Sequence, residues 1–176
     1  MEKGKIIFLN GVSSAGKTTL AKSLQSNLFE PFFLLSYDMF CDMSSEKFLK
    51  TNPKETTSII KTGLHHTIKL FSDIGINTII DHVILKGKGS ETNLTNLDDM
   101  AECVHLLHDY DVVFVHVMCP LDELRRREKE RGNRVPGTAE YQLSILNPQD
   151  TYDITVDTFN ESIEEWSLNK NACKWE

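Results

Sequence analysis

The residues with the clearest chemical meaning form the segment Gly11-Val-Ser-Ser-Ala-Gly-Lys-Thr18. It matches the pattern G-x-x-x-x-G-K-[ST], in which a loop's backbone N–H groups surround phosphate oxygens. The apolar run Ile6 to Leu9 precedes it, and leucines at four-residue steps follow it, as a strand–loop–helix arrangement requires. There Lys17 reaches the β- and γ-phosphates and the Thr18 hydroxyl binds Mg²⁺. The segment predicts that the chain binds ATP and Mg²⁺.

The predicted nucleotide contacts extend over the whole loop and the start of the next helix. Gly11 and Gly16 are expected to allow backbone angles that a side chain would oppose, so that N–H groups turn towards an anion. A helix that begins near Lys17 adds further N–H donors and the positive end of its dipole. The predicted nucleotide-binding residues are Gly11, Val12, Ser13, Ser14, Ala15, Gly16, Lys17, Thr18 and Thr19.

Other motifs narrow the class of nucleotide-binding protein. GTPases read guanine with N-K-x-D, but the Asn-Lys pair here continues as Asn169-Lys-Asn-Ala172, without the Asp. The H-R-D and D-F-G motifs of eukaryotic protein kinases do not occur. A small-molecule kinase needs a base for the accepting hydroxyl, a carboxylate near the metal and cations over the transferred phosphate. Each of these has a candidate.

Asp38 is the candidate general base. It follows the second apolar run, in Ser36-Tyr-Asp-Met-Phe40. Ligands of parallel α/β sheets bind outside the carboxyl ends of the strands, so this carboxylate is expected to face the γ-phosphate. The alternative is a helix N-cap, for which Asp is a favoured residue.

Asp81 is the candidate metal carboxylate, because it ends the apolar run from Asn77 to Ile80. At that position it is expected to hold Mg²⁺ together with Thr18, directly or through water. Contact with the substrate and capping of the strand end are the alternatives. His82, the next residue, is more typical of a loop or packing histidine than of a catalyst.

The basic run Arg125 to Arg134 supplies the candidate cations. Most such runs are solvated helix faces, and this interpretation suffices for most of Arg125 to Arg127. Arg131 and Arg134 differ because they flank Gly132, where a hinge would let them close over the phosphates. We predict that both are catalytic and belong to a short lid at about residues 131–140.

These residues are positioned by apolar runs that alternate with helical patterns. Strands are expected at 5–10, 31–36, 77–81, 112–118 and, shorter, 152–157. Helices are expected at 18–28, 55–75, 94–107, 121–130 and 161–168. Runs that are apolar throughout suit strands covered on both faces. We predict an α/β fold with a doubly wound, five-stranded parallel sheet in three layers, as one P-loop kinase domain over residues 1–176.

The composition excludes several classes of partner. A formal charge of −7 over 176 residues argues against broad attachment to nucleic acid or an anionic membrane. The first apolar run is too short for a signal peptide or a membrane span, so the cytoplasm is the expected location. The four cysteines are scattered and interpreted as reduced thiols. Homo-oligomer formation is left open.

Taken together, these residues resemble the chloramphenicol phosphotransferase family, ATP-dependent kinases that inactivate the antibiotic by phosphorylating a hydroxyl. The resemblance covers about residues 6–166. It rests on the ordered segments Leu9-Asn-Gly-Val-Ser-Ser-Ala-Gly-Lys17, Leu24-Gln-Ser26 with Glu30-Pro31, Asp38, Ile79-Ile-Asp81, Arg131-Gly-Asn-Arg-Val135 with Gly137, and Tyr152-Asp-Ile-Thr-Val-Asp-Thr158.

The resemblance implies a nucleoside-monophosphate-kinase-like sheet, ATP in the loop, Asp38 as general base and a lid that carries arginines. The family's Asp-Asp after strand three is replaced by Asp81-His82, and residues 40–56 differ from its acceptor-side region. The family therefore implies the reaction more firmly than the acceptor, for which an antibiotic is one candidate. The alternatives are a metabolite, nucleoside or sugar kinase of the same fold and a non-catalytic nucleotide-binding regulator.

Overall fold

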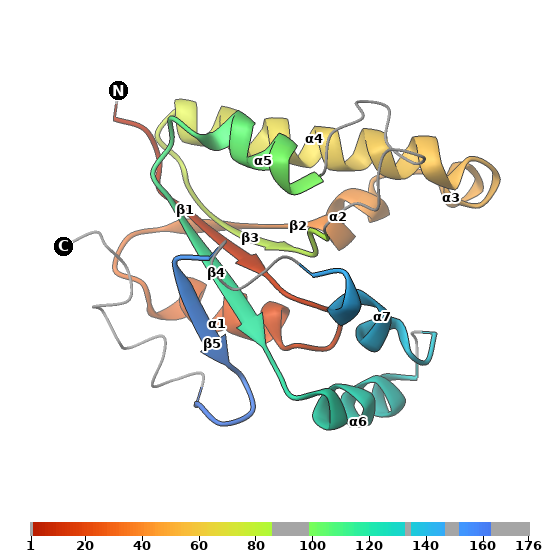
Figure 1. The fold of residues 1–176 in the computed structure, drawn as a ribbon. Coiled ribbons are helices and arrows are strands. Elements are labelled where there is room, and N and C mark those ends of the chain that lie inside the picture. Colours follow the sequence, from red (N-terminus) through yellow and green to blue (C-terminus); the bar gives the residue numbers. More distant parts are fainter. Residues whose placement is uncertain (1, 86–98, 133–134, 147–151, 163–176) are drawn as a thin grey trace.

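The computed structural model describes residues 2–85, 99–132, 135–146 and 152–162. In these residues one parallel sheet is formed, with strand order β2-β3-β1-β4-β5. Its central strand, β1, leads into the segment of residues 11–16, the glycine-rich loop (Figure 1). The strands are β1 (Ile6–Asn10), β2 (Phe32–Ser36), β3 (Asn77–His82), β4 (Val112–Met118) and β5 (Ile154–Asp157). The predicted five-stranded parallel sheet is confirmed.

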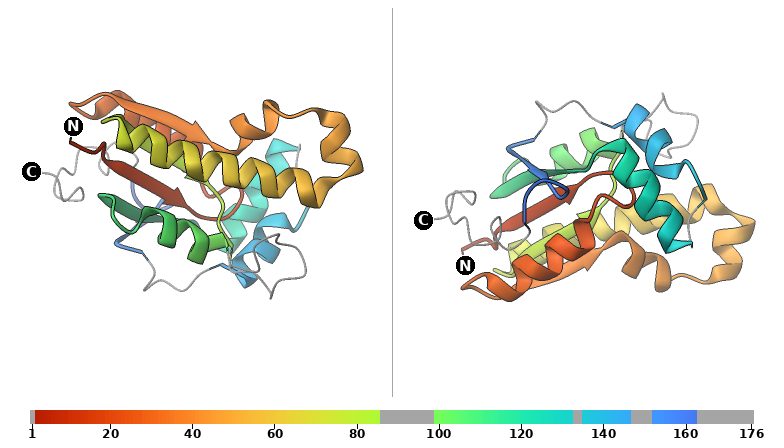
Figure 2. Two further views of the ribbon diagram at one scale, coloured as in Figure 1. Left: turned by 90° about the horizontal axis from the view of Figure 1, so that it is seen from above. Right: turned by 90° about the horizontal axis from the view of Figure 1, so that it is seen from below.

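Helices cover both faces of the sheet. Helices α4 and α5 lie on one face and α1 on the other, as the views from above and below show (Figure 2). The helices of the described residues are α1 (Lys17–Asn27), α2 (Tyr37–Asp42), α3 (Glu46–Thr51), α4 (Pro53–Asp73), α5 (Asp99–Leu107), α6 (Leu121–Arg131) and α7 (Thr138–Ser144). This is the predicted three-layer arrangement.

The alternating residues of β1 explain why both faces are covered. Ile7 and Leu9 belong to the core that α1 completes with residues such as Leu20. Ile6 and Phe8 belong to the core that α4 completes with residues such as Leu64. All six side chains are almost fully buried. Burying such a side chain contributes about 1.5–3 kcal/mol, so the all-apolar strand stabilises both layers.

The predicted helices agree with the structure best where they are long. Helix α4 follows the predicted stripe of Ile60, Leu64 and Ile68 and begins at Pro53, a favoured residue in a first turn. Of the helix predicted at 94–107, the structure has α5 from Asp99, because residues 86–98 lie outside the described part. The helix predicted at 161–168 lies outside it as well, apart from its first two residues. The six-residue helices α2 and α3 and the seven-residue α7 were not predicted.

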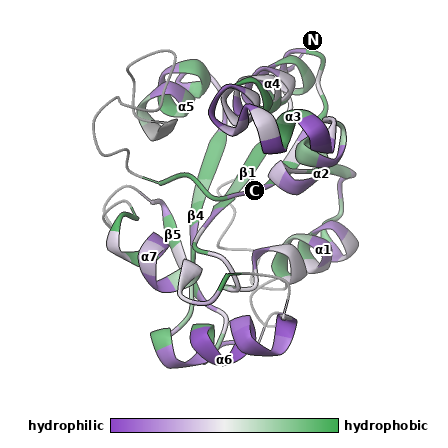
Figure 3. Ribbon diagram, turned by 90° about the vertical axis from the view of Figure 1, so that its right-hand side faces the viewer, coloured by the Kyte–Doolittle hydropathy of each residue, from purple (hydrophilic) through white to green (hydrophobic). Residues whose placement is uncertain are grey.

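The carboxyl ends of β1, β2 and β3 lie side by side at one edge of the sheet. Asp81 of β3 is in register with Leu9 of β1 on one side and with Ser36 of β2 on the other. Helices α2 and α4 lie on one side of these strand ends, and the mostly hydrophilic α6 lies on the other (Figure 3). In the part of the chain that the structure describes, no helix combines the length and the apolar character needed to cross a bilayer.

Candidate active site

A cavity of about 790 Å³ opens at these strand ends. Residues from the glycine-rich loop, from the ends of β2 and β3 and from helices α1, α2, α4, α6 and α7 line it. The lining residues are Ser13, Ser14, Gly16, Lys17, Thr18, Thr19, Ser36, Tyr37, Asp38, Lys61, Asp81, His82, Val83, Leu85, Arg127, Glu130, Arg131, Thr138, Gln142 and Thr158. The cavity thus collects most of the predicted site residues, whereas Gly11, Val12 and Ala15 are buried and do not line it.

The two glycines of the loop are needed for different reasons. Gly16 has φ 97°, in the left-handed region, as expected. Gly11 does not lie in that region; instead, a Cβ there would lie 2.2 Å from the carbonyl oxygen of Val117. The prediction that Gly11 serves a special backbone angle is therefore wrong: it permits close packing of the loop on β4. Ser14 has φ 64°, a strained conformation for a residue with a side chain, and such strain is common at functional sites.

Lys17 and Asn10 fix the shape of the loop. The Nζ of Lys17, which is buried, donates a hydrogen bond of 3.0 Å to the carbonyl oxygen of Val12. Asn10 Oδ1 accepts hydrogen bonds from the backbone N–H groups of Gly11 and Ile84, at 3.0 and 2.8 Å. The side chain of Asn10 therefore joins the start of the loop to the segment after β3.

Thr18 and Asp81 present two oxygens to the cavity. Thr18 Oγ1 donates a hydrogen bond of 2.6 Å to Asp81 Oδ2. Mg²⁺ is held in many kinases by only one or two protein oxygens, with phosphate oxygens and waters completing its shell. A hydroxyl and a carboxylate at this separation fit that donor set, so Thr18 and Asp81 are the residues that could hold the ion.

Asp38 is exposed to the cavity in the first turn of α2. The residue that caps this helix is Ser36, whose Oγ accepts a hydrogen bond of 3.1 Å from the N–H of Met39. The capping alternative for Asp38 is thus wrong, because another side chain takes that position. The carboxylate of Asp38 lines the same cavity as Asp81.

Arg131 is exposed, lines the cavity and ends α6, while Arg134 lies outside the described residues. Gly132, with φ 63°, caps the helix. The return from this turn is anchored by the buried carboxylate of Glu128, which accepts hydrogen bonds from the N–H groups of Gly137 (2.7 Å) and Ala139 (3.1 Å). The lid at residues 131–140 stays a prediction.

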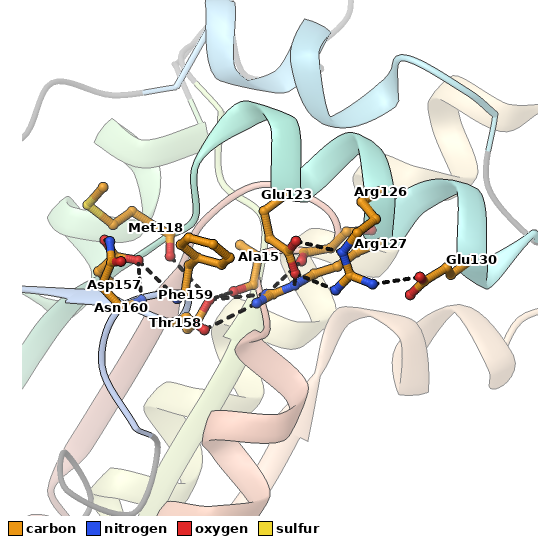
Figure 4. A network of polar contacts seen from close by, with 11 residues as sticks. Ala15, Met118, Glu123, Arg126, Arg127, Glu130, Asp157, Thr158, Phe159 and Asn160 are labelled. Atoms are coloured by element: carbon orange, nitrogen blue, oxygen red, sulfur yellow. Dashed lines mark hydrogen bonds and ion pairs between the residues drawn. The ribbon is translucent and has the colours of Figure 1, made fainter.

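Arg127 differs from its neighbours in the basic run (Figure 4). Arg125 and Arg126 are exposed and pair with carboxylates, as predicted for a solvated face. Arg127 instead is mostly buried and lines the cavity; it donates to the carbonyl oxygens of Thr158 and Ser14, at 3.1 and 3.4 Å. For Arg127 the prediction of a solvated face is therefore wrong, because it lies on the side of α6 that packs on the loop.

Glu123 orients Arg126 and Arg127. It binds Arg126 and Arg127 through its carboxylate, and these hydrogen bonds, the one from Arg126 first, hold its pKa at about 2. The carboxylate thus stays ionised over the physiological range. Because Arg127 also contacts Ser14, Glu123 helps to hold α6 against the loop.

Gln142 and Lys61 are among the cavity residues that the sequence analysis missed. Gln142 of α7 accepts a hydrogen bond of 2.6 Å from the N–H of Ser13 through Oε1, which joins the unpredicted helix to the loop. Lys61 of α4 reaches the cavity from the opposite layer. Neither belongs to a motif, and only the packing of the helices brings them to the site.

His82 is buried, with 2% of its surface exposed, as expected for a packing histidine, yet it lines the cavity. Its ring stacks on that of Tyr37, with centroids 5.1 Å apart. Burial lowers its pKa well below 6.5, and the charges of His65, Lys61 and Lys17 lower it further. His82 is therefore neutral at physiological pH.

Comparisons with known proteins agree with this arrangement. The model of a family described as chloramphenicol phosphotransferase-like protein matches residues 4–171. A Mycobacterium tuberculosis protein named "Putative O-phosphotransferase" is 24% identical over 189 residues, covering 94% of this chain and 80% of that protein. A sugar kinase from Janibacter sp. has a TM-score of 0.68 at 19% identity, over 97% of this chain and 96% of that one. The Mycobacterium tuberculosis APS kinase CysC, in complex with AMPPNP and APS, has a TM-score of 0.62 at 17% identity, over 95% of both chains. The structural likeness shows the P-loop kinase fold.

Proposed function

Because the chain belongs to the chloramphenicol phosphotransferase-like family, we propose that it transfers the γ-phosphate of ATP to a hydroxyl group of a small molecule. The observation that carries this proposal is the shared cavity. The glycine-rich loop, the Thr18–Asp81 pair and the exposed carboxylate of Asp38 all line it. A triphosphate-binding loop and a carboxylate that can act as a base, both lining one cavity, are what transfer to an alcohol requires.

Asp38 acts as the general base in this proposal. Its carboxylate accepts the proton of the acceptor hydroxyl as the oxygen forms a bond to the γ-phosphorus. The bond between that phosphorus and the oxygen bridging it to the β-phosphate breaks, and ADP leaves with the electron pair. The structure supports this role through the position of Asp38 in the first turn of α2, at the cavity wall.

The cations stabilise the charge that spreads over the phosphoryl oxygens. Lys17 approaches from the loop and Arg131 from the end of α6, and Arg134 is proposed to join them as the lid closes. Arginines in such positions contribute about 10³–10⁵-fold to the rate in related phosphoryl-transfer enzymes. A Mg²⁺ ion on Thr18 and Asp81 would neutralise charge on the β- and γ-phosphate oxygens.

The acceptor is not fixed by family membership. Chloramphenicol is one candidate, because the family model bears its name. A metabolite, nucleoside or sugar is the alternative, since His82 replaces the family's second carboxylate and the acceptor-side region, which forms α2 and α3, departs from the family's pattern. A regulator without transfer activity would bind ATP but show no acceptor-dependent release of ADP.

Mass spectrometry of a panel of antibiotics and hydroxylated metabolites, each incubated with the protein, ATP and Mg²⁺, tests the proposal. We expect at least one compound to gain a single phosphoryl group and the Lys17→Ala variant to produce none. Tight ATP binding without any phosphorylated product across the panel, and without acceptor-dependent ADP release, would favour the regulator instead.

A further inference from the structure

One cation of the cavity comes from a different layer of the fold than the others. Lys17, Arg127 and Arg131 belong to α1 and α6, which hold and flank the glycine-rich loop. Lys61 belongs to α4, which lies with α2 across the strand ends from α6 (Figure 3). Helix α2 carries Asp38, so Lys61 lies on the same side of the cavity as the proposed base.

His82 stands beside Lys61 on this wall. Lys61 is close enough to act on the imidazole through its charge, and Tyr37 and His65 pack against the ring at centroid distances of 5.1 and 5.6 Å. Neither ring nitrogen of His82 has a hydrogen-bond partner among the described residues. A buried polar atom without a partner is unfavourable, and at a cavity wall it is typical of a group whose partner is a ligand.

We propose that the acceptor carries an anionic group, a carboxylate or a phosphate, which binds Lys61 and His82 while its hydroxyl faces Asp38. This inference rests on the proposed function and names the class of its acceptor. The Lys61 ammonium supplies the charge for the anion. The imidazole of His82 supplies an N–H donor, which fixes the orientation of the anion.

A bound nucleotide alone does not explain why Lys61 and His82 line the cavity on the side of Asp38. Residues of the loop line the cavity together with Lys17 and Arg131, and they supply the groups proposed to bind the triphosphate. A neutral acceptor would offer the ammonium of Lys61 and the imidazole of His82 only uncharged oxygen atoms, which form weaker hydrogen bonds than an anion does. An anion placed there would bind both Lys61 and His82. Its hydrogen bonds would be charge-assisted, and such bonds are about twice as strong as neutral ones.

Pairs of acceptors that differ only in charge test the inference. Hydroxy acids are compared with their methyl esters, and sugar phosphates with the free sugars, by ADP release and product mass at saturating ATP. In one of the two types of pair, we expect kcat/KM to be at least about tenfold higher for the charged member than for the neutral one. The type of pair that shows this difference tells whether the site binds a carboxylate or a phosphate. Equal or higher values for the neutral members would overturn the inference.

The Lys61→Met variant identifies the residue responsible. A charge-assisted hydrogen bond contributes about 1.5–3 kcal/mol, so the preference for the charged acceptor should fall about 10–100-fold while KM for ATP stays unchanged. Lys54→Met, which removes an exposed charge from the same helix outside the cavity lining, is the matched control. A rise in KM for ATP alone in Lys61→Met would assign this lysine to the nucleotide and overturn the inference.

Binding measurements separate this inference from the proposed function. The same pairs are titrated onto the protein saturated with AMPPNP and Mg²⁺, followed by calorimetry. Binding of charged members that is lost in Lys61→Met supports the subsite even if no phosphoryl transfer is found, in which case only the proposed function fails. Transfer to neutral alcohols with no binding preference for charge supports the function and rejects the subsite.

Discussion

The hydroxyl of Thr18 donates a hydrogen bond of 2.6 Å to the carboxylate of Asp81, which joins the first turn of α1 to the end of β3. The two residues are 63 positions apart in the sequence and meet because β3 lies beside β1 in the sheet. We propose that these two oxygens hold the Mg²⁺ ion of a bound triphosphate.

The first prediction concerns this pair. Asp81→Asn keeps the size of the side chain but removes its charge, so it should raise the Mg²⁺ concentration needed for half-maximal activity and lower kcat by about tenfold or more. Steady-state ADP release over a Mg²⁺ series measures both. Asp122→Asn, which removes a fully exposed carboxylate on α6, should leave both values unchanged. An unaltered Mg²⁺ dependence in Asp81→Asn would contradict the proposed metal role.

The second prediction concerns Asp38. Asp38→Ala should lower turnover by about 10²–10⁴-fold, the usual scale for loss of a general base, with little change in ATP affinity. Single-turnover transfer to the acceptor found in the panel measures the first effect, and nucleotide titration measures the second. Asp42→Ala changes a carboxylate in the same helix that does not line the cavity, and should retain activity. Wild-type turnover in Asp38→Ala would remove Asp38 from the mechanism.

The third prediction concerns the anchor of the turn between α6 and α7. Glu128 is buried and accepts two backbone N–H groups, so Glu128→Ala leaves Gly137 and Ala139 without their partner. Chemical denaturation should show a loss of about 1.5–3 kcal/mol. Glu130→Ala, which removes an exposed ion pair with Arg126, should cost less than about 1 kcal/mol. Equal losses in the two variants would mean that Glu128 does not anchor this turn.

The fourth prediction separates two glycines. Gly11→Ala places a Cβ 2.2 Å from the Val117 carbonyl oxygen, so the loop or β4 must move, and we expect a loss of about 3 kcal/mol or more. Gly132→Ala meets no described atom within 4 Å and should cost only about 1–2 kcal/mol, from its left-handed backbone. Urea denaturation of both variants tests the difference. A larger loss at Gly132 would mean that backbone angle outweighs packing.

The sequence predicted the parts of the site that a local pattern specifies. A strand, a glycine-rich loop and a helix are neighbours in the chain, so the phosphate cradle could be recognised without knowing the fold. Asp38 and Asp81 could be placed because parallel strands end at one edge of the sheet, whatever their order.

The rest of the site depends on tertiary packing. The run Arg125 to Arg127 contains three adjacent arginines, and only the rotation of α6 against the loop decides that Arg127 faces inward. Lys61 lies in a helix whose apolar stripe predicts which face is buried but not that its polar edge reaches a cavity. Gln142 lies in a seven-residue helix, which is too short for a periodic pattern to reveal.

The last prediction is a pH dependence of stability that comes from His82. Its pKa in the folded chain lies well below 6.5, whereas in the unfolded chain it is about 6.5. Above pH 6.5 both states are neutral and the group has no effect on stability. As the pH falls below 6.5, the unfolded chain binds a proton that the folded chain does not, so the free energy of unfolding should decrease by up to about 1.4 kcal/mol per pH unit from this group.

His82→Gln removes that dependence without removing the hydrogen-bonding character of the side chain. Urea denaturation between pH 7.5 and about 5 should give a shallower decline for the variant than for the wild type. The variant should keep the share of the decline that comes from His116, whose pKa burial also lowers. Parallel declines in the two proteins would mean that His82 takes up a proton in the folded state as readily as in the unfolded one, which its burial among Phe8, Tyr37 and His65 should prevent.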